Sequence, residues 1–274
     1  MNWLEAIVLG IVQGLTEFLP ISSSGHLLVV PQLLGWADPG ASFTAVIQLG
    51  TMAAVLLFFW RDVIRISWAW LRSLWTPSLR GVLDARMGWY IILGTIPISI
   101  LGIVFSDQIK TIARDLRLTA TMLIIFGIIL WAADKFNPQQ RKIEEVTWRH
   151  SLLYGCAQAL ALIPGVSRSG ATITMGRLLK YDREAAARFS FLLSIPAIVL
   201  SGLYELKDIG SDGSPAWGPT ILATIVAFIV GYLSIAWLLR YLTSHSLLIF
   251  AIYRVVVGLG IFALLAAGTL SPHS

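Results

Sequence analysis

Charged residues are scarce in this chain of 274 residues. Only 13% of them are Asp, Glu, Lys or Arg, whereas 57% are apolar and the mean hydropathy is +0.78. Soluble domains carry about 25% charged residues, so the composition excludes a water-soluble globule. It also argues against disordered, collagen-like and nucleic-acid-binding chains, because the few basic residues stand between hydrophobic runs. No nucleic-acid partner is therefore expected.

Cysteine is almost absent as well. The single Cys156 excludes an internal disulfide and any CxxC metal or redox site. The first basic residue is Arg61, so the amino-terminal apolar segment lacks the basic region of a cleaved signal peptide, and we expect Met1–Val30 to remain in the mature protein. The motifs HExxH, GxxxxGK and GxSxG are also missing, which disfavours zincins, P-loop ATPases and nucleophile-elbow hydrolases.

Long apolar runs dominate the chain instead, and we interpret six of them as membrane spans. They are Phe43–Trp60, Gly88–Phe105, Leu118–Ala133, Glu184–Tyr204, Pro219–Leu239 and Leu247–Ala267. A long basic connection, Arg61–Arg86, separates the first two. Each half of the chain thus has three predicted crossings.

Each set of three crossings is preceded by a helix that stops early. These helices are Trp3–Leu19 and Ser151–Ile163, and the apolar pieces after them are His26–Leu34 and Ala171–Leu179. Pro20 and Pro164 mark the breaks. The pieces that follow are too short to cross a bilayer at about 1.5 Å per residue. The economical interpretation is a re-entrant helical hairpin at the start of each half.

An internal repeat relates the two halves. A shift of 145 residues superposes Gly10 on Gly155, Gln13 on Gln158, Leu15 on Leu160, Ser22 on Ser167, Ser24 on Ser169 and Gly25 on Gly170. Farther along, Gly127 resembles Gly258 at an offset of 131. We therefore expect one membrane domain, 1–274, made of a first repeat, 1–140, and a second repeat, 146–274. Three crossings reverse the chain, so the second repeat is inverted.

The predicted fold is thus an all-α integral membrane protein with two inverted-topology repeats, each a re-entrant helical hairpin plus three transmembrane helices. In this topology 14 of the 20 Lys and Arg fall on one side. The other side has Lys110, Arg114, Arg117 and Lys207. The positive-inside rule makes the richer side cytoplasmic, so the first hairpin enters from outside. Transporters share this construction, and the architecture alone leaves transport open.

Four ionisable residues lie in otherwise apolar surroundings. They are Glu17, His26, Arg168 and Arg254. A charge at bilayer depth costs about 2.5–3.5 kcal/mol on insertion scales, so such residues are candidates for function. For Arg254 a structural ion pair between two helices explains the residue equally well.

The two breaks each place small and polar residues before a new helix. Ser runs there are often only N-caps, the interpretation with most weight for Ser24. The alternative starts from the free amides and positive end of a helix N-terminus, which bind phosphate. Arg168 can grip phosphate oxygens bidentately, so two opposed helix ends suit a diphosphate. The candidate phosphate-binding residues are Ser22, Ser24, Gly25, Gly165, Ser167, Ser169 and Gly170.

The hairpins are chemically unequal. At the offset of 145, Glu17 stands opposite Leu162, Ser23 opposite Arg168, and His26 opposite Ala171. The first hairpin therefore holds a carboxylate, a candidate nucleophile and an imidazole, and the second holds the anion clamp. Phosphoryl transfer needs a nucleophile, a proton carrier and charge stabilisation, so this division favours an enzyme.

Two motifs closely resemble the bacterial undecaprenyl-diphosphate phosphatase family, of the bacitracin-resistance type. Gln13–His26 matches its (E/Q)xxxE stretch and Ser/His segment, and Pro164–Thr172 matches its PGxSRSxxT motif, which adds Thr172 to the candidate phosphate-binding residues. Phe189–Pro196 and Ala251–Arg254 also look like family segments, and the resemblance covers essentially the whole chain.

The resemblance implies hydrolysis of undecaprenyl diphosphate to the monophosphate and inorganic phosphate in the bacterial plasma membrane, which recycles the lipid carrier for peptidoglycan and other envelope polymers. It implies dependence on Mg²⁺ or Ca²⁺, with Glu17 and Gln13 as metal ligands. Polyprenyl diphosphate and membrane lipid are the expected partners, and a homo-oligomer is left open.

As catalytic roles we expect Ser23 to attack phosphorus and His26 to act as base or acid. Glu17 would bind metal or orient His26, and Arg168 would stabilise the transferred phosphoryl group. Two alternatives make His26 or a metal-activated water the nucleophile. The alternative function is an inverted-repeat transporter or flippase for a phosphorylated lipid or an anion.

Overall fold

Helices build the protein. The computed structural model describes residues 1–106, 108–109, 115–205 and 217–272, and no β-strand occurs among them. The α-helices are α1 Trp3–Phe18, α2 Ser23–Leu33, α3 Gly40–Phe58, α4 Trp60–Trp75, α5 Leu83–Val104, α7 Leu116–Phe136, α8 Trp148–Ala159, α9 Arg168–Leu178, α10 Arg183–Glu205, α11 Trp217–Leu242 and α12 Leu248–Ala266. Short 3₁₀ turns are η1 Pro77–Leu79, η2 Ile143–Glu145 and η3 Leu160–Leu162. Lys110, Arg114 and Lys207 of the charge count lie outside the described residues.

The apolar helices confirm a multi-pass membrane protein. Within the described residues, α5, α7, α11 and α12 are long and apolar enough to cross a bilayer, and they coincide with four of the six predicted spans. A fifth candidate is α3 combined with α4, which meet at a bend of 74°. The remaining predicted span, Glu184–Tyr204, lies in α10, which carries Arg183, Glu184 and Arg188 in its first turns and is not among the candidate spans of the described residues.

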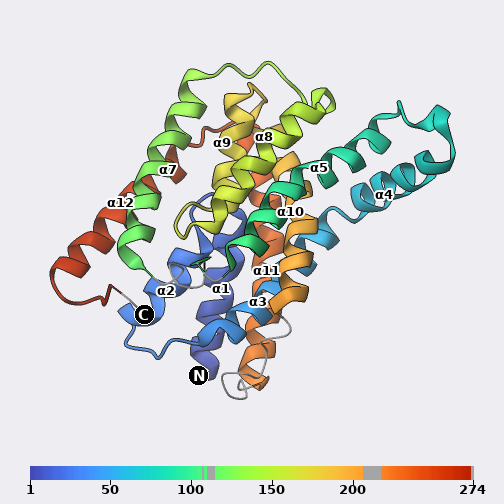
Figure 1. Ribbon diagram of the computed structural model, residues 1–274. Helices are drawn as coiled ribbons and strands as arrows, with labels where there is room; N and C mark the ends of the chain where they lie inside the picture. The colour runs from blue at the N-terminus through green and yellow to red at the C-terminus, as the bar shows by residue number, and fades with distance from the viewer. Residues whose placement is uncertain (107, 110–114, 206–216, 273–274) are drawn as a thin grey trace.

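The connection expected at Arg61–Arg86 contains a further helix. Figure 1 shows α4 and the start of α5 projecting together from the bundle as an arm. In α4, Trp, Ile and Leu recur at helical spacing with Arg between them, a pattern typical of an amphipathic helix rather than of a loop. Asp62 at its start is buried and pairs with Arg65 and with Arg188 of α10. The ion pair between Asp62 and Arg188 attaches the arm to the bundle.

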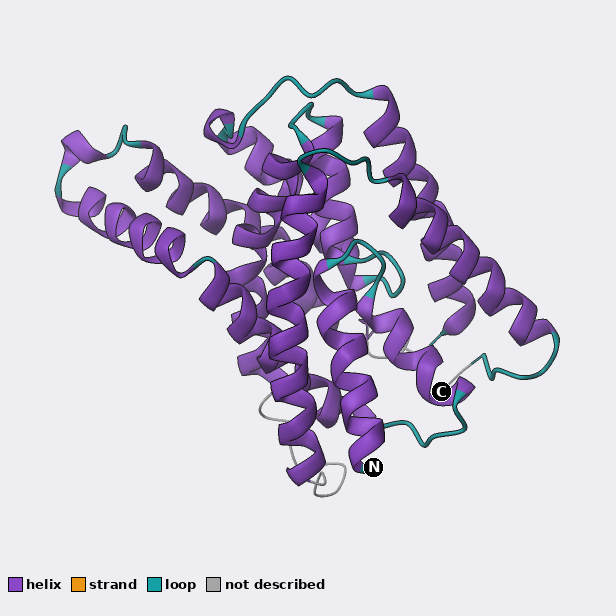
Figure 2. Cartoon of the chain, turned by 180° about the vertical axis from the view of Figure 1, so that it is seen from behind, coloured by secondary structure: helices purple, strands orange, loops and turns teal. Residues whose placement is uncertain are grey.

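Two helical hairpins occupy the interior. The first consists of α1 and α2, and the second of α8, η3 and α9. Figure 2 shows loop segments in the middle of the bundle, where these hairpins turn. At the turns, Ser22 and Ser167 both have a left-handed backbone, with φ of 78° and 69°. The hydroxyl of each lies 3.2 Å from that of the serine two residues later, Ser24 or Ser169. The two turns thus share one local geometry.

Glycines allow the helices to approach closely. A Cβ added to Gly14 of α1 would lie 2.9 Å from the carbonyl oxygen of Ala227 on α11. The contact between α7 and α12 is reciprocal. A Cβ on Gly127 would lie 3.2 Å from the Ala251 oxygen, and a Cβ on Gly258 would lie 2.8 Å from the Ala120 oxygen. Small residues are how membrane helices reach such close packing.

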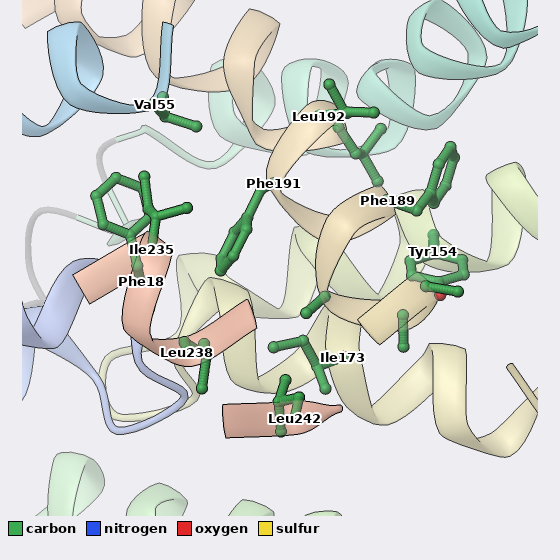
Figure 3. Close-up of a cluster of buried hydrophobic side chains, with 14 of the residues drawn as sticks. Phe18, Val55, Tyr154, Ile173, Phe189, Phe191, Leu192, Ile235, Leu238 and Leu242 are labelled. Carbon is green, nitrogen blue, oxygen red and sulfur yellow. The ribbon is translucent and has the colours of Figure 1, made fainter. Parts of the chain in front are cut away.

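The largest buried hydrophobic cluster joins the hairpins to the spanning helices. Figure 3 shows Phe18 of α1 and Phe191 of α10 among its members, and their rings meet edge to face at 5.7 Å. Tyr154 of α8 packs against Phe189 of the same α10 at 4.8 Å. Because α10 contacts both hairpins through aromatic rings, it fixes where their turns lie.

Two glycines of α12 provide a matched test of the close contact between α7 and α12. In Gly258→Ala the new methyl group would lie 2.6 Å from Ile124 Cγ1 and 2.8 Å from the Ala120 oxygen, whereas around Gly260 no atom lies within 4 Å. Overpacking costs about 1–3 kcal/mol, so we expect Gly258→Ala to lower the thermal unfolding temperature in detergent by several degrees. Gly260→Ala should not lower it. Equal unfolding temperatures for the two variants would contradict the α7–α12 contact.

Candidate active site

Glu17 links the two hairpins. It lies in the last turn of α1, and its side chain is only 7% exposed. One carboxylate oxygen accepts a hydrogen bond from the Ser23 hydroxyl at 2.8 Å and one from Gln13 at 3.3 Å. The other oxygen pairs with the guanidinium of Arg168, the first residue of α9. Of the predicted catalytic residues, Glu17, Ser23 and Arg168 therefore form one hydrogen-bonded group.

His26 is held by other partners. Its Nδ1 lies 2.7 Å from the Ser22 carbonyl oxygen, one turn earlier in the chain, and its Nε2 lies 2.7 Å from the hydroxyl of Tyr253. Glu17 does not orient His26 among the described residues, which corrects that expectation. The physical reason is the turn of α2, which directs Ser23 toward the carboxylate while the imidazole folds back on the turn.

The start of α2 offers free backbone donors. In the described part of the chain, the amides of Ser23, Ser24 and Gly25 have no protein acceptor, and the Ser22 side chain makes no capping bond. Ser24 is exposed and Ser23 is half-buried. Unpaired amides at a helix N-terminus favour an anion. This arrangement favours the phosphate-binding interpretation over the simple N-cap.

The start of α9 is more fully engaged. Ser167 caps the helix, because the Gly170 amide donates to its hydroxyl at 3.1 Å. Ser169 donates to the carbonyl oxygen of Leu19 at 3.1 Å and so connects the second hairpin to the first. Thr172 is fully buried, and its hydroxyl donates to the Arg168 carbonyl at 2.8 Å. The hydroxyls of Ser169 and Thr172 thus hold the turn, which favours a structural role for them.

Both turns rest against Thr119 of α7. Gly25 lies so close that an added Cβ would be 3.0 Å from the Thr119 Cγ2. Gly165 has φ of +89° and lies even closer to the Thr119 backbone, so this position needs glycine both for its backbone conformation and for space. Glycine is therefore required at positions 25 and 165, because the two hairpin turns and α7 meet there with no room for a larger side chain.

Arg254 is buried, and among the described residues it has no acidic partner. The alternative of a helix-to-helix ion pair is therefore not seen there, since the guanidinium instead donates to backbone carbonyls. The acceptors are Pro20 at 3.1 Å, Gly165 and Val166 at 2.9 Å each, Leu123 at 3.3 Å and Met122 at 3.4 Å. Pro20 belongs to the first hairpin turn and Gly165 to the second. Arg254 therefore joins both turns to α7.

Sequence reasoning missed two residues of the site, Tyr253 and Thr119. Tyr253 lies in the segment Ala251–Arg254 that resembles the family. Neighbouring residues on a helix point in different directions, so the segment alone does not predict which of its side chains faces His26. Thr119 had no signal, because a threonine inside an apolar span is ordinary.

The acidic residues are too few for a metal site made by protein alone. Among the described residues no group of three or more His, Cys, Asp or Glu could hold an ion. Gln13, the other predicted ligand, donates to Glu17 and, at 3.4 Å, to Thr51. Mg²⁺ is commonly held by one or two carboxylates together with substrate phosphates. The single Glu17 carboxylate beside the free amides of α2 fits an ion shared with substrate phosphates.

Fold and site together define a helical membrane protein with an ionised polar site buried between two helical hairpins. The chain belongs to the family described as bacitracin resistance protein BacA, which residues 6–260 match. It is 56% identical over 272 residues to an undecaprenyl-diphosphatase of a Nocardioides species, with 99% of each chain covered. It is similar to undecaprenyl-diphosphatase 2 of Frankia casuarinae, at 56% identity over all of this chain and 98% of that one. The undecaprenyl-diphosphatase of Thermobifida fusca is 53% identical over all of this chain and 94% of its own.

Removing the Arg254 guanidinium should destabilise the protein even without substrate. Arg254→Leu removes the donor to five carbonyl groups, of which those of Pro20, Gly165 and Val166 lie in the turns outside any helix, and a buried carbonyl left without a partner costs about 1–3 kcal/mol. We expect a large fall in the thermal unfolding temperature in detergent. Arg240→Leu, at an exposed position of α11, is the control and should have little effect. Equal unfolding temperatures for the two variants would show that Arg254 does not hold the turns.

Proposed function

We propose that this chain hydrolyses undecaprenyl diphosphate to undecaprenyl phosphate and inorganic phosphate, and so recycles the lipid carrier for peptidoglycan synthesis. The relatives named undecaprenyl-diphosphatase support the reaction. The observation that carries it is the hydrogen bond from Ser23 to Glu17 at 2.8 Å, with Arg168 on the same carboxylate. A hydroxyl, its proton acceptor and a cation for phosphoryl oxygens thus meet at one place.

In the proposed reaction Ser23 attacks the terminal phosphorus. Glu17 takes the hydroxyl proton, the bond between phosphorus and the bridging oxygen breaks, and the lipid monophosphate leaves. Water then attacks the phosphoserine, inorganic phosphate departs and the serine oxygen recovers a proton. This sequence gives Glu17 the role of base toward Ser23, because the carboxylate and not His26 accepts the hydrogen bond. His26 would act as acid or base on the headgroup.

Arg168 and the free amides of α2 would stabilise the transferred phosphoryl group. The Arg168 side chain is 16% exposed, so an incoming phosphate can reach it. A diphosphate brings more negative charge than the single Glu17 carboxylate, and bidentate pairing of arginine with phosphate is strong. On substrate binding the guanidinium would therefore turn part of its contacts from Glu17 to the substrate. Ser22, Ser24 and Gly25 would line the other side of that phosphate.

We also propose dependence on a divalent cation, Mg²⁺ or Ca²⁺. The Glu17 oxygen that Arg168 leaves on substrate binding would hold the ion, with Gln13 beside it, while the other oxygen serves Ser23, and the substrate phosphates would complete the ligands of the ion. The ion would supply positive charge that offsets the charge of the diphosphate.

The proposed setting is the bacterial plasma membrane, with two inverted repeats whose hairpins enter from opposite faces and the active site open to the outer side. The shared geometry of Ser22 and Ser167 supports a repeat. So does the reciprocal contact of Gly127 and Gly258, because equivalent residues meet equivalent neighbours. The orientation rests on the distribution of Lys and Arg.

A transporter or flippase with the same helices is not favoured. The relatives are named for diphosphatase activity. A transport site also gives no reason for a hydroxyl that donates to a buried carboxylate.

Ser23→Ala tests the proposed nucleophile. We expect release of inorganic phosphate from a polyprenyl diphosphate by the purified protein to fall by about 10³-fold or more, because the attacking oxygen is gone. Ser244→Ala, at an exposed loop serine, should keep full activity. Near-normal turnover by Ser23→Ala would rule out the serine route and leave His26 or a metal-activated water.

Removal of metal tests the cation. Phosphate release should stop after treatment with EDTA and return when excess Mg²⁺ or Ca²⁺ is added, since the diphosphate charge would otherwise stay uncompensated. EDTA already saturated with Mg²⁺ serves as the control and should not inhibit. Unchanged turnover in metal-free buffer would exclude a required divalent cation.

A further inference from the structure

His26 and Tyr253 form a contact that the proposed reaction leaves unexplained. They are 227 positions apart, and the imidazole Nε2 lies 2.7 Å from the tyrosine hydroxyl. Their rings are also nearly parallel, at 9°, with centroids 5.6 Å apart. Two independent contacts thus fix the plane and the direction of the imidazole.

The partners of the two ring nitrogens assign the proton. Nδ1 lies 2.7 Å from the Ser22 carbonyl oxygen, which can only accept, so Nδ1 carries the hydrogen and donates it. In neutral imidazole Nε2 is then the acceptor, and the hydroxyl of Tyr253 donates to it. The network therefore selects one tautomer, with the lone pair on Nε2.

Tyr253 lies where this hydrogen bond can open. It is 41% exposed, and its neighbours on the same face of α12, Ile249 and Val256, are both more than half exposed. The next residue, Arg254, is completely buried in its carbonyl contacts and so fixes this turn of α12. The tyrosine is thus held at its base beside the buried Arg254, while its side chain stands on an exposed part of α12.

We propose that Tyr253 is a positioning residue for His26. The Ser22 carbonyl keeps the proton on Nδ1, and Tyr253 holds the plane and the direction of the imidazole, so that the Nε2 side of the ring faces the lipid headgroup. This inference rests on the proposed phosphatase function, in which His26 acts on that headgroup. Tyr253 works through His26 and need not touch the reacting atoms.

A double-mutant cycle tests this coupling. Tyr253→Phe keeps the ring contact and removes the donor, and it should lower kcat for phosphate release by about 3- to 10-fold, the factor of one net hydrogen bond, while KM stays unchanged. In a His26→Ala background the same substitution should cause no further loss. The matched control is Tyr232→Phe, whose ring packs on Phe58 at 5.3 Å and which should keep full activity.

A merely structural role for Tyr253 would give the opposite result. The loss caused by Tyr253→Phe would then be the same with and without His26, and the thermal unfolding temperature would fall with it. That outcome, or full activity of Tyr253→Phe, would overturn the proposal.

A second measurement does not depend on turnover. Nitrogen-15 NMR of histidine-labelled protein, with the His26 signals assigned by their loss in His26→Ala, should show the proton on Nδ1 in both the wild type and Tyr253→Phe, because the Ser22 acceptor remains. The Nε2 signal should move downfield in Tyr253→Phe, because that nitrogen loses its hydrogen-bond donor. A proton on Nε2 in the wild type, or an Nε2 signal at the same position in both proteins, would overturn the proposal. Absence of phosphate release by the wild type would refute the proposed function instead, and the spectra would still decide the role of Tyr253.

Discussion

A buried guanidinium that donates to backbone carbonyl groups holds the centre of this protein together. Arg254 is fully buried, and its donors reach carbonyl groups of both hairpin turns and of α7. Turns cannot supply their own backbone partners as helices do, and in a membrane no water replaces them. The guanidinium can leave water because those carbonyl groups accept its hydrogen bonds. The carbonyl groups can be buried because the guanidinium donates to them. Every feature of the site, from the Glu17–Arg168 pair to the free amides of α2, depends on the two turns staying in this place.

Arg168 and Arg254 differ in whether a carboxylate compensates their charge. Arg168 pairs with Glu17, so that its charge is compensated. Within the described part of the chain, Arg254 meets only the partial negative charges of carbonyl oxygens, so Glu17, Arg168 and Arg254 together leave one positive charge without a carboxylate partner. Such a centre attracts an anion in a medium of low dielectric constant. The positive charge favours the diphosphate headgroup, while the glycine contacts around it keep the helices close enough to exclude lipid.

Most of the helices could be predicted from the sequence, and most of the contacts could not. Pro20 stops α1 within a residue or two of the expected point, because a proline cannot continue the hydrogen bonding of a helix. The helix Trp60–Trp75 escaped prediction because its arginines interrupt every apolar run. At the site, Glu17 and Arg168 were found as ionisable residues in apolar surroundings, but their pairing joins positions 151 residues apart. The carbonyl partners of Arg254 were beyond reach, since every residue has a carbonyl group.

The reciprocal contact between α7 and α12 has a consequence for the origin of such a chain. Gly127 lies against Ala251 and Gly258 against Ala120, so each helix offers the surface that the other accepts. Two identical subunits make contacts of this kind about a twofold axis. A half-length chain with one such helix would already carry both sides of the interface and could assemble as a pair. Fusion of two such halves would replace an encounter that depends on concentration with one that the linker guarantees, and it would free one hairpin to acquire the acid and the other the arginine.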